Sequence, residues 1–136
     1  MGRSVDGPDK LRLFERAVTA STNSIVITDP NQPDDPIVYV NPAFERTTGY
    51  SKGEVVGLNC RFLQGEHRHQ RPALDELRAA VREGRECRVV LRNYRKDGTR
   101  FWNELSVYPV RDERGRLMNF VGVQNDVTER RRAEQE

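Results

Sequence analysis

Cys60 stands in a short stretch of side chains that could bind a small molecule. The segment GLNCRFLQG, residues 57–65, places this cysteine between Asn59 and Arg61, with Gln64 four positions further on. Carboxamides donate and accept hydrogen bonds, and a guanidinium binds anions. Cys60 is therefore either a buried apolar residue, which is a common fate of a free cysteine, or a thiol directed at an electrophilic ligand.

Three further carboxamides lie in the strands expected for the C-terminal half. Because side chains alternate between the two faces of a strand, Asn93, Asn103 and Gln124 each share a face with apolar residues. The other residues of that face are Cys87, Val89, Leu91, Phe101, Leu105, Val107, Pro109, Met118, Phe120 and Gly122. A buried amide needs partners. The three amides therefore bond to one another or to loops, or they bind one edge of a flat ligand that has both donors and acceptors.

Arg78 poses a similar alternative in a predicted helix. Leu74, Leu77 and Val81 form the apolar stripe of this helix, and Arg78 lies on the same stripe. Its side chain either extends to the rim or pairs with a carboxylate, or it joins Arg61 in binding an anion at a pocket mouth. A phosphate suits the bidentate geometry of guanidinium. A flat, amide-edged and phosphorylated ligand is expected, and flavin mononucleotide (FMN) has these three properties.

The elements that must position these residues form an α+β domain. Strands are predicted at residues 24–29, 37–40, 86–95, 100–110 and 117–127, and helices at residues 10–20, 42–49, 51–57, 59–65 and 71–84. The order of two strands, several short helices and three strands predicts a five-stranded antiparallel sheet with helices on one face. Residues 1–9 are expected to be a flexible leader, and residues 127–136 have the composition of a helix start.

Bulk composition excludes several classes of protein. The chain has 136 residues, the size of one domain, with 23 basic and 21 acidic residues, so it lacks the basic excess of a dedicated nucleic-acid surface. Its two cysteines give neither a disulfide framework nor zinc-ligand spacing, and no metal site is predicted. No apolar stretch approaches the roughly 20 residues of a membrane span, and no secretory or lipidation signal is found. A cytoplasmic protein without membrane or direct nucleic-acid partners is expected.

The residues then point to a known family. GLNCRFLQG closely resembles the flavin-binding signature of light-oxygen-voltage (LOV) domains, a branch of the PAS fold. Residues 24–51 resemble the opening hairpin and first helices of that family, and residues 93–130 resemble its last three strands and exit linker. The similarity spans roughly residues 22–130. Within the family, the chain resembles the bacterial short LOV proteins. The resemblance implies a blue-light photoreceptor that binds FMN and signals through its terminal helices.

The resemblance also implies a role for each motif residue. Cys60 would form a reversible bond to the flavin C4a atom after blue-light excitation. Asn59 and Gln64 would bind the ribityl chain and the polar edge of the ring, and Arg61 and Arg78 would hold the phosphate. Asn93 and Asn103 would bond the pyrimidine edge, and Gln124 would face N5 and O4. The walls would be Val26, Thr28, Leu63, Leu91, Leu105, Val107, Phe120 and Gly122.

Several positions depart from the common pattern of the family. Leu58 replaces a residue that is often polar, which matters little if its side chain points outward, and Asp35 stands where Asn is common, so no ligand contact is expected from it. The loop EHRHQRP, residues 66–72, lacks the long insertion of relatives that bind a dinucleotide flavin. Its length favours FMN over FAD, and riboflavin is also less favoured.

Signalling is expected to run from the ligand to the C-terminus. When flavin N5 gains a proton it changes from acceptor to donor, and the Gln124 amide can follow by rotating. Gln124 lies just before the exit linker that begins at Asp126, so these two residues are the expected signalling residues. The domain boundaries implied are a leader and cap helix over residues 1–21, a LOV core over 22–126 and a linker or helix start over 127–136.

Partners are expected on the outer sheet face. Its residues are Val90, Tyr94, Trp102, Tyr108, Val121 and Val123, which would form a sizeable apolar patch if left bare. A terminal helix or a second subunit is expected to cover them, giving a homodimer, unless they are scattered and covered one by one. An output domain or partner protein outside this chain is also expected, and no enzymatic activity.

Two other functions stay open at this point. The second reading is a light-insensitive PAS module for ligand binding or dimerisation. The third is an enzyme with Cys60 as nucleophile, assisted by His67 or His69, although both histidines lie in a charged loop without an orienting acid. Uptake of a yellow, light-bleachable cofactor distinguishes these readings from a photoreceptor.

Overall fold

The computed structural model describes residues 7–65 and 70–135, and its element order matches the predicted one. The elements in chain order are α1 (Gly7–Ala20), β1 (Ser24–Thr28), β2 (Ile37–Val40), α2 (Pro42–Thr48), α3 (Lys52–Val55), the 3-10 helix η1 (Cys60–Leu63), α4 (Arg71–Glu83), β3 (Cys87–Tyr94), β4 (Arg100–Arg111), β5 (Leu117–Asp126) and α5 (Thr128–Gln135). The first helix begins three residues earlier than predicted, because Pro8 is tolerated in a first helical turn.

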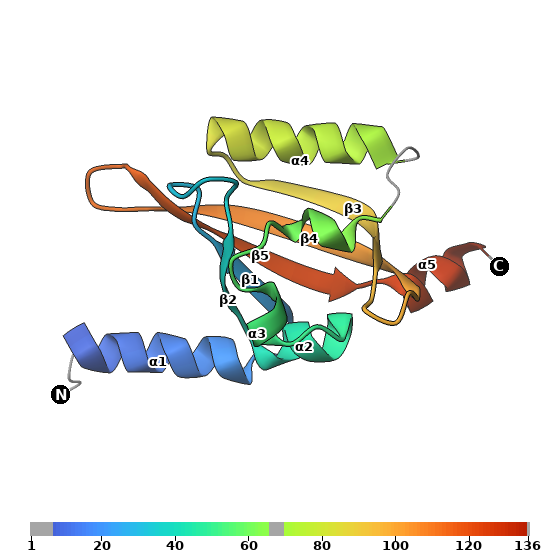
Figure 1. Ribbon diagram of the computed structural model, residues 1–136, viewed down its shortest axis with the longest axis horizontal. Helices are drawn as coiled ribbons and strands as arrows, with labels where there is room; N and C mark the ends of the chain where they lie inside the picture. The colour runs from blue at the N-terminus through green and yellow to red at the C-terminus, as the bar shows by residue number, and fades with distance from the viewer. Residues whose placement is uncertain (1–6, 66–69, 136) are drawn as a thin grey trace.

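The five strands form one antiparallel sheet in the order β2-β1-β5-β4-β3 (Figure 1). Its register brings the predicted residues onto one face. Leu91 lies opposite Asn103, and Leu105 lies opposite Gln124. At the centre, Gly122 lies between Val26 on β1 and Val107 on β4. The face assigned from strand alternation is therefore confirmed.

Local capping interactions begin and end the short helices on this face. The Asn41 side chain accepts a hydrogen bond from the Phe44 N–H at 3.1 Å and begins α2, which ends at Gly49 in the left-handed conformation. The same amide accepts from the Ile25 N–H and donates to the Val18 and Asn23 carbonyls, so it also fixes β1 and the end of α1. In α3, the Ser51 N–H donates to the Glu54 carboxylate at 2.9 Å, as a capping box predicts.

The described residues form two separate apolar clusters in the interior. One cluster joins β1 and β2 to α2, α3 and η1, and consists of Val26, Ile37, Val40, Phe44, Val55 and Leu63. The other consists of Leu74, Val89 and Leu91, where α4 packs on β3. In Figure 1, α4 lies along β3 while α2 and α3 lie beside β1 and β2. Protein interiors are close-packed, so a gap between two clusters is a place for a ligand.

The outer sheet face is covered only in part. The exit helix α5 packs on β4, with the Arg131 guanidinium 4.2 Å from the centre of the Trp102 ring. Tyr108 remains 44% exposed, and the α1 residues Leu13 and Phe14 are more than half exposed. Among the described residues, the expected terminal-helix cover therefore exists where α5 packs on β4 and does not extend over Tyr108.

Candidate functional site

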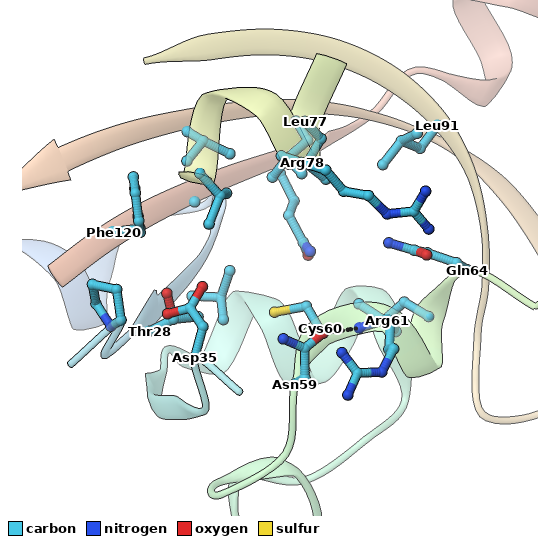
Figure 2. A pocket seen from close by; sticks show the side chains of 18 of the residues that line it. Thr28, Asp35, Asn59, Cys60, Arg61, Gln64, Leu77, Arg78, Leu91 and Phe120 are labelled. Carbon is cyan, nitrogen blue, oxygen red and sulfur yellow. Dashed lines mark hydrogen bonds between the residues drawn. The ribbon is translucent and has the colours of Figure 1, made fainter. Parts of the chain in front are cut away.

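A cavity of about 490 Å³ lies between the inner sheet face, η1 and α4 (Figure 2). The predicted signalling residue Asp126 does not line it, but the predicted photoactive and cofactor-binding residues all do, namely Val26, Thr28, Asn59, Cys60, Arg61, Leu63, Gln64, Arg78, Leu91, Asn93, Asn103, Leu105, Val107, Phe120, Gly122 and Gln124. This volume is in the usual range of pockets for drug-sized ligands. The structure thus brings together residues that are up to 98 positions apart in the chain, from Val26 to Gln124.

Cys60 is the first residue of η1, and its sulfur points into the cavity (Figure 2). The Asn59 side chain begins this helix by accepting a hydrogen bond from the Arg61 N–H at 3.0 Å. The thiol is half-buried, and burial raises its pKa from 9.0 to about 12, with a further increase from the Asp35 carboxylate. Cys60 is therefore a neutral thiol at physiological pH, held at the cavity wall.

The three carboxamides of the sheet are buried and only partly satisfied by one another. Asn103 donates from Nδ2 to Oδ1 of Asn93 at 2.8 Å, so the expectation that these amides bond together is correct for this pair. The Oδ1 atom of Asn103 is buried without a hydrogen-bond partner among the described residues. Gln124 accepts at Oε1 from the Ser24 hydroxyl at 2.8 Å. The Oδ1 atom of Asn103 is therefore an unpartnered acceptor at the cavity wall, next to the Asn93 amide to which Asn103 donates.

Arginines gather at the rim of the cavity. Arg61 forms an ion pair with Asp34, and Arg78 lies 3.6 Å from Asp75. All four side chains are mostly exposed, so these pairs are weak and leave the guanidiniums available to another anion. In Figure 2, Arg78 extends from α4 across the cavity toward Gln64.

The loop after β1 adds the Asp35 carboxylate to the cavity wall, although no ligand contact was expected from this residue. Asp34 and Asp35 both adopt positive φ values, 68° and 47°, a conformation that Asp tolerates better than most residues. The Asn59 amide donates to the Asp34 carbonyl at 2.8 Å, which ties the loop to η1. The Asp35 carboxyl faces the cavity (Figure 2), and burial is the main cause that raises its pKa. The Oδ1 atom of Asp35 has no hydrogen-bond partner among the described residues.

Sequence reasoning missed several wall residues, which are Pro30, Gln32, Asp34, Asp35, Leu77, Val81 and Arg82. Leu77 and Val81 were recognised as the apolar stripe of α4, but not as ligand wall. Arg82 follows Arg78 by four residues, so helical spacing could have placed it on the same rim. The loop residues have no periodic signal, because turns are positioned by their ends.

The remaining chemical candidates lie elsewhere. Cys87 is half-buried against the α4 cluster and does not line the cavity, and burial is the main cause that raises its pKa. Leu58 is 48% exposed, as expected for a side chain that points outward. His67 and His69 lie outside the described residues.

Within residues 7–65 and 70–135 no group of three metal-ligating side chains was found, and no helix there is long and apolar enough to cross a membrane.

Comparisons with known proteins agree with this geometry. The family model of the PAS domain matches residues 22–129. A blue-light photoreceptor of Listeria monocytogenes is 46% identical over 113 residues, which are 83% of this chain and 44% of that protein. The LOV domain of a blue-light-activated histidine kinase from Erythrobacter litoralis superposes with a TM-score of 0.74 at 45% identity, covering 78% of this chain and 96% of that one.

A larger solved structure gives the same fold. An RNA-binding light-oxygen-voltage receptor superposes with a TM-score of 0.88 at 41% identity, covering 99% of this chain and 38% of that one. The chain spans less than half the length of this receptor and of the Listeria photoreceptor. The match to the PAS family model, together with these identities to LOV proteins, establishes the family: the chain belongs to the PAS domains and, among them, to the LOV domains.

Proposed function

We propose that this chain is a blue-light-sensing domain that binds FMN in the cavity and uses Cys60 as its photoactive thiol. The observation that carries the proposal is the Cys60 sulfur, which points into a cavity of about 490 Å³ walled by apolar side chains and amides. Membership in the LOV domains supports the same function. A light-insensitive PAS module is the alternative that the experiment below excludes or retains.

The residues present fit a flat ring with a polar edge. Asn103 Oδ1 and Thr28 Oγ1 are buried without a hydrogen-bond partner among the described residues, a condition that costs free energy unless a ligand satisfies them. Gly122 lets two wall residues pack closely, because a Cβ atom there would lie 2.9 Å from Cγ1 of Val26. Asn93, Asn103 and Gln124 would hold the polar edge, and the apolar wall residues would enclose the ring faces.

Arginines at the rim favour a phosphorylated flavin over riboflavin. Arg61, Arg78 and Arg82 line the cavity, and a phosphate accepts bidentate hydrogen bonds from guanidinium groups. Asp34 and Asp75 neutralise two of these arginines in part, so a phosphate would compete with exposed carboxylates rather than with buried ones.

When bound, a flavin supplies blue-light absorption and, once excited, a ring carbon open to a thiol beside a ring nitrogen that takes up the thiol proton. Cys60 supplies both the sulfur and the proton, because its raised pKa keeps the thiol protonated in the dark. In darkness Cys60 would regain its proton and return to the neutral thiol. No external oxidant or reductant is consumed in this cycle.

Gln124 is the residue that transmits the change. Its amide has a donor end and an acceptor end, so rotation exchanges the group that it presents to the cavity. Rotation would break the 2.8 Å bond from Ser24. Two residues after Gln124, Asp126 pairs with Arg95 and accepts from the Thr128 N–H, and this contact begins α5. A change at Gln124 therefore reaches the exit helix over a few residues.

Two surfaces would carry the signal further. The exposed part of the outer sheet face and the exposed apolar residues of α1 would pair with a second copy, forming a homodimer. The domain itself would act as a sensor without catalytic activity, and an output domain or partner protein would respond to α5.

Absorption spectroscopy of the purified protein tests the proposal. A flavin-loaded protein is yellow, and its blue absorption band should bleach under blue light and return in darkness. A protein that takes up no flavin, or one that takes it up and does not bleach, would support the light-insensitive module instead.

A further inference from the structure

A second pocket lies on the sheet face opposite to the cavity. Its volume is about 280 Å³, and its wall consists of Arg92, Arg100, Phe101, Trp102, Thr128 and Arg132. Arg92, Arg100 and Trp102 come from the paired strands β3 and β4, whereas Thr128 and Arg132 belong to α5. The pocket is therefore built where the sheet meets the exit helix.

The pocket contains more positive charge than its surroundings compensate. Within the described part of the chain, Arg92 and Arg100 take part in no ion pair, and Arg132 pairs with Glu129 at 3.2 Å. The Glu129 side chain is 87% exposed, so this pair is weak.

Nearby carboxylates are engaged by other arginines. Glu104, which shares the outer face of β4 with Trp102, pairs with Arg130 at 3.1 Å. Asp126, at the end of β5, pairs with Arg95 at 2.6 Å. Neither carboxylate is therefore left to neutralise Arg92 or Arg100.

Trp102 holds one of the three pocket guanidinium groups, that of Arg92, in place. The Cζ atom of Arg92 lies 4.9 Å from the centre of the Trp102 ring, and that of Arg131 lies 4.2 Å from it. Cation–π contacts of this kind restrict arginine side chains without neutralising them. The arginine donors stay available, because the ring offers no hydrogen-bond acceptor on its face.

We propose that this pocket binds a phosphate group. Three guanidinium groups from β3, β4 and α5 surround one space, and the oxygens of a tetrahedral phosphate can accept from several of them at once. A carboxylate has only two oxygens in one plane and matches this arrangement less well. The bound phosphate bridges the sheet to α5 through Arg132, so it holds the exit helix on the outer face.

The single tryptophan of the chain, Trp102, makes the binding directly measurable. Inorganic phosphate is titrated into the flavin-loaded protein at constant ionic strength, with sodium chloride as the reference salt. Trp102 fluorescence and the NMR shift of its indole N–H are both recorded. A saturable change in either signal is expected with phosphate and not with chloride, together with slower hydrogen exchange over residues 128–135.

Variants separate this pocket from the cavity. Arg92→Gln and Arg100→Gln should each weaken phosphate binding by about tenfold or more, as loss of a charge-assisted hydrogen bond predicts. Arg114→Gln, in the exposed turn between β4 and β5, should bind as the parent does. Circular dichroism and thermal melting confirm that each variant is folded.

Specific outcomes overturn the proposal. Absence of a saturable change in both the fluorescence and the NMR signal excludes a phosphate site. Unchanged affinity in Arg92→Gln and Arg100→Gln, or loss of binding in Arg114→Gln, places the phosphate elsewhere. Adenosine monophosphate identifies the natural form of the ligand: affinity equal to that of phosphate assigns the pocket to the phosphate group alone, and tighter binding assigns it to a nucleotide.

Discussion

The Ser24 hydroxyl donates a hydrogen bond to Oε1 of Gln124 at 2.8 Å, and both side chains are buried where β1 pairs with β5. This bond occupies the acceptor end of the Gln124 amide, so its N–H donors are left for the cavity. The dark orientation of Gln124 is thus set by a residue of a different strand, 100 positions away in the sequence.

Gln124→Leu tests whether this amide transmits the signal. The substitution roughly preserves volume and removes the group that can exchange donor for acceptor. Bleaching by blue light should persist, because Cys60 is unchanged, and the dark absorption band should shift slightly to the blue. The light-induced change in hydrogen exchange over residues 126–135 should shrink strongly.

Ser24→Ala is the matched comparison, because it removes the partner and keeps the amide. Its light response over the same residues should remain. A full response of the exit helix in Gln124→Leu would remove Gln124 from the pathway and attribute the motion of β5 to direct strain from the ligand.

Arg61→Gln and Arg78→Gln test whether the arginines at the cavity rim bind the phosphate of FMN. Each should weaken FMN binding by roughly tenfold to a hundredfold, the range for loss of a charge-assisted hydrogen bond. Riboflavin lacks the phosphate, so its affinity should stay nearly constant in both variants. Flavin fluorescence quenching measures both ligands, with Arg114→Gln as the control. Equal losses for FMN and riboflavin would show that the arginines support the fold and do not bind the phosphate.

Asp35→Asn tests the electrostatic control of the thiol. Burial is the larger cause of the raised Cys60 pKa and the Asp35 charge is the smaller one, so the variant should lower that pKa while keeping it above 9.0. The thiolate fraction at a given alkaline pH should therefore increase. The pH dependence of iodoacetamide alkylation measures it, in a Cys87→Ser background so that only Cys60 reacts.

Asp35→Glu keeps the charge and serves as the control for this experiment. Its alkylation profile should stay close to that of the parent. If Asp35→Asn and the parent have the same pH midpoint, the Asp35 carboxylate does not influence the thiol.

Much of the fold could be predicted because its signals are local. Strand alternation placed Asn93, Asn103 and Gln124 on one face, since side chains alternate with period two whatever the rest of the chain does. Asn41 and Gly49 marked both ends of α2 through capping chemistry that depends on a few neighbouring atoms.

Contacts between segments that are distant in the sequence could not be predicted in the same way. Nothing near Ser24 in the sequence indicates that its hydroxyl meets Gln124, because that contact depends on the register of β1 and β5. The Asp35 carboxyl faces the cavity because two consecutive residues adopt positive φ, a backbone choice with no periodic signature. The arginine pocket beside α5 likewise depends on how that helix docks on β4.

The most direct test of the central claim compares Cys60→Ala with Cys87→Ser under blue light, both loaded with FMN. Cys60→Ala should bind flavin, since the sulfur contributes little contact in the dark, but it should keep its blue absorption and fluoresce persistently during illumination. Cys87→Ser should bleach and recover as the parent does, because Cys87 does not line the cavity. Bleaching of Cys60→Ala followed by normal dark recovery would contradict the assignment of Cys60 as the photoactive thiol.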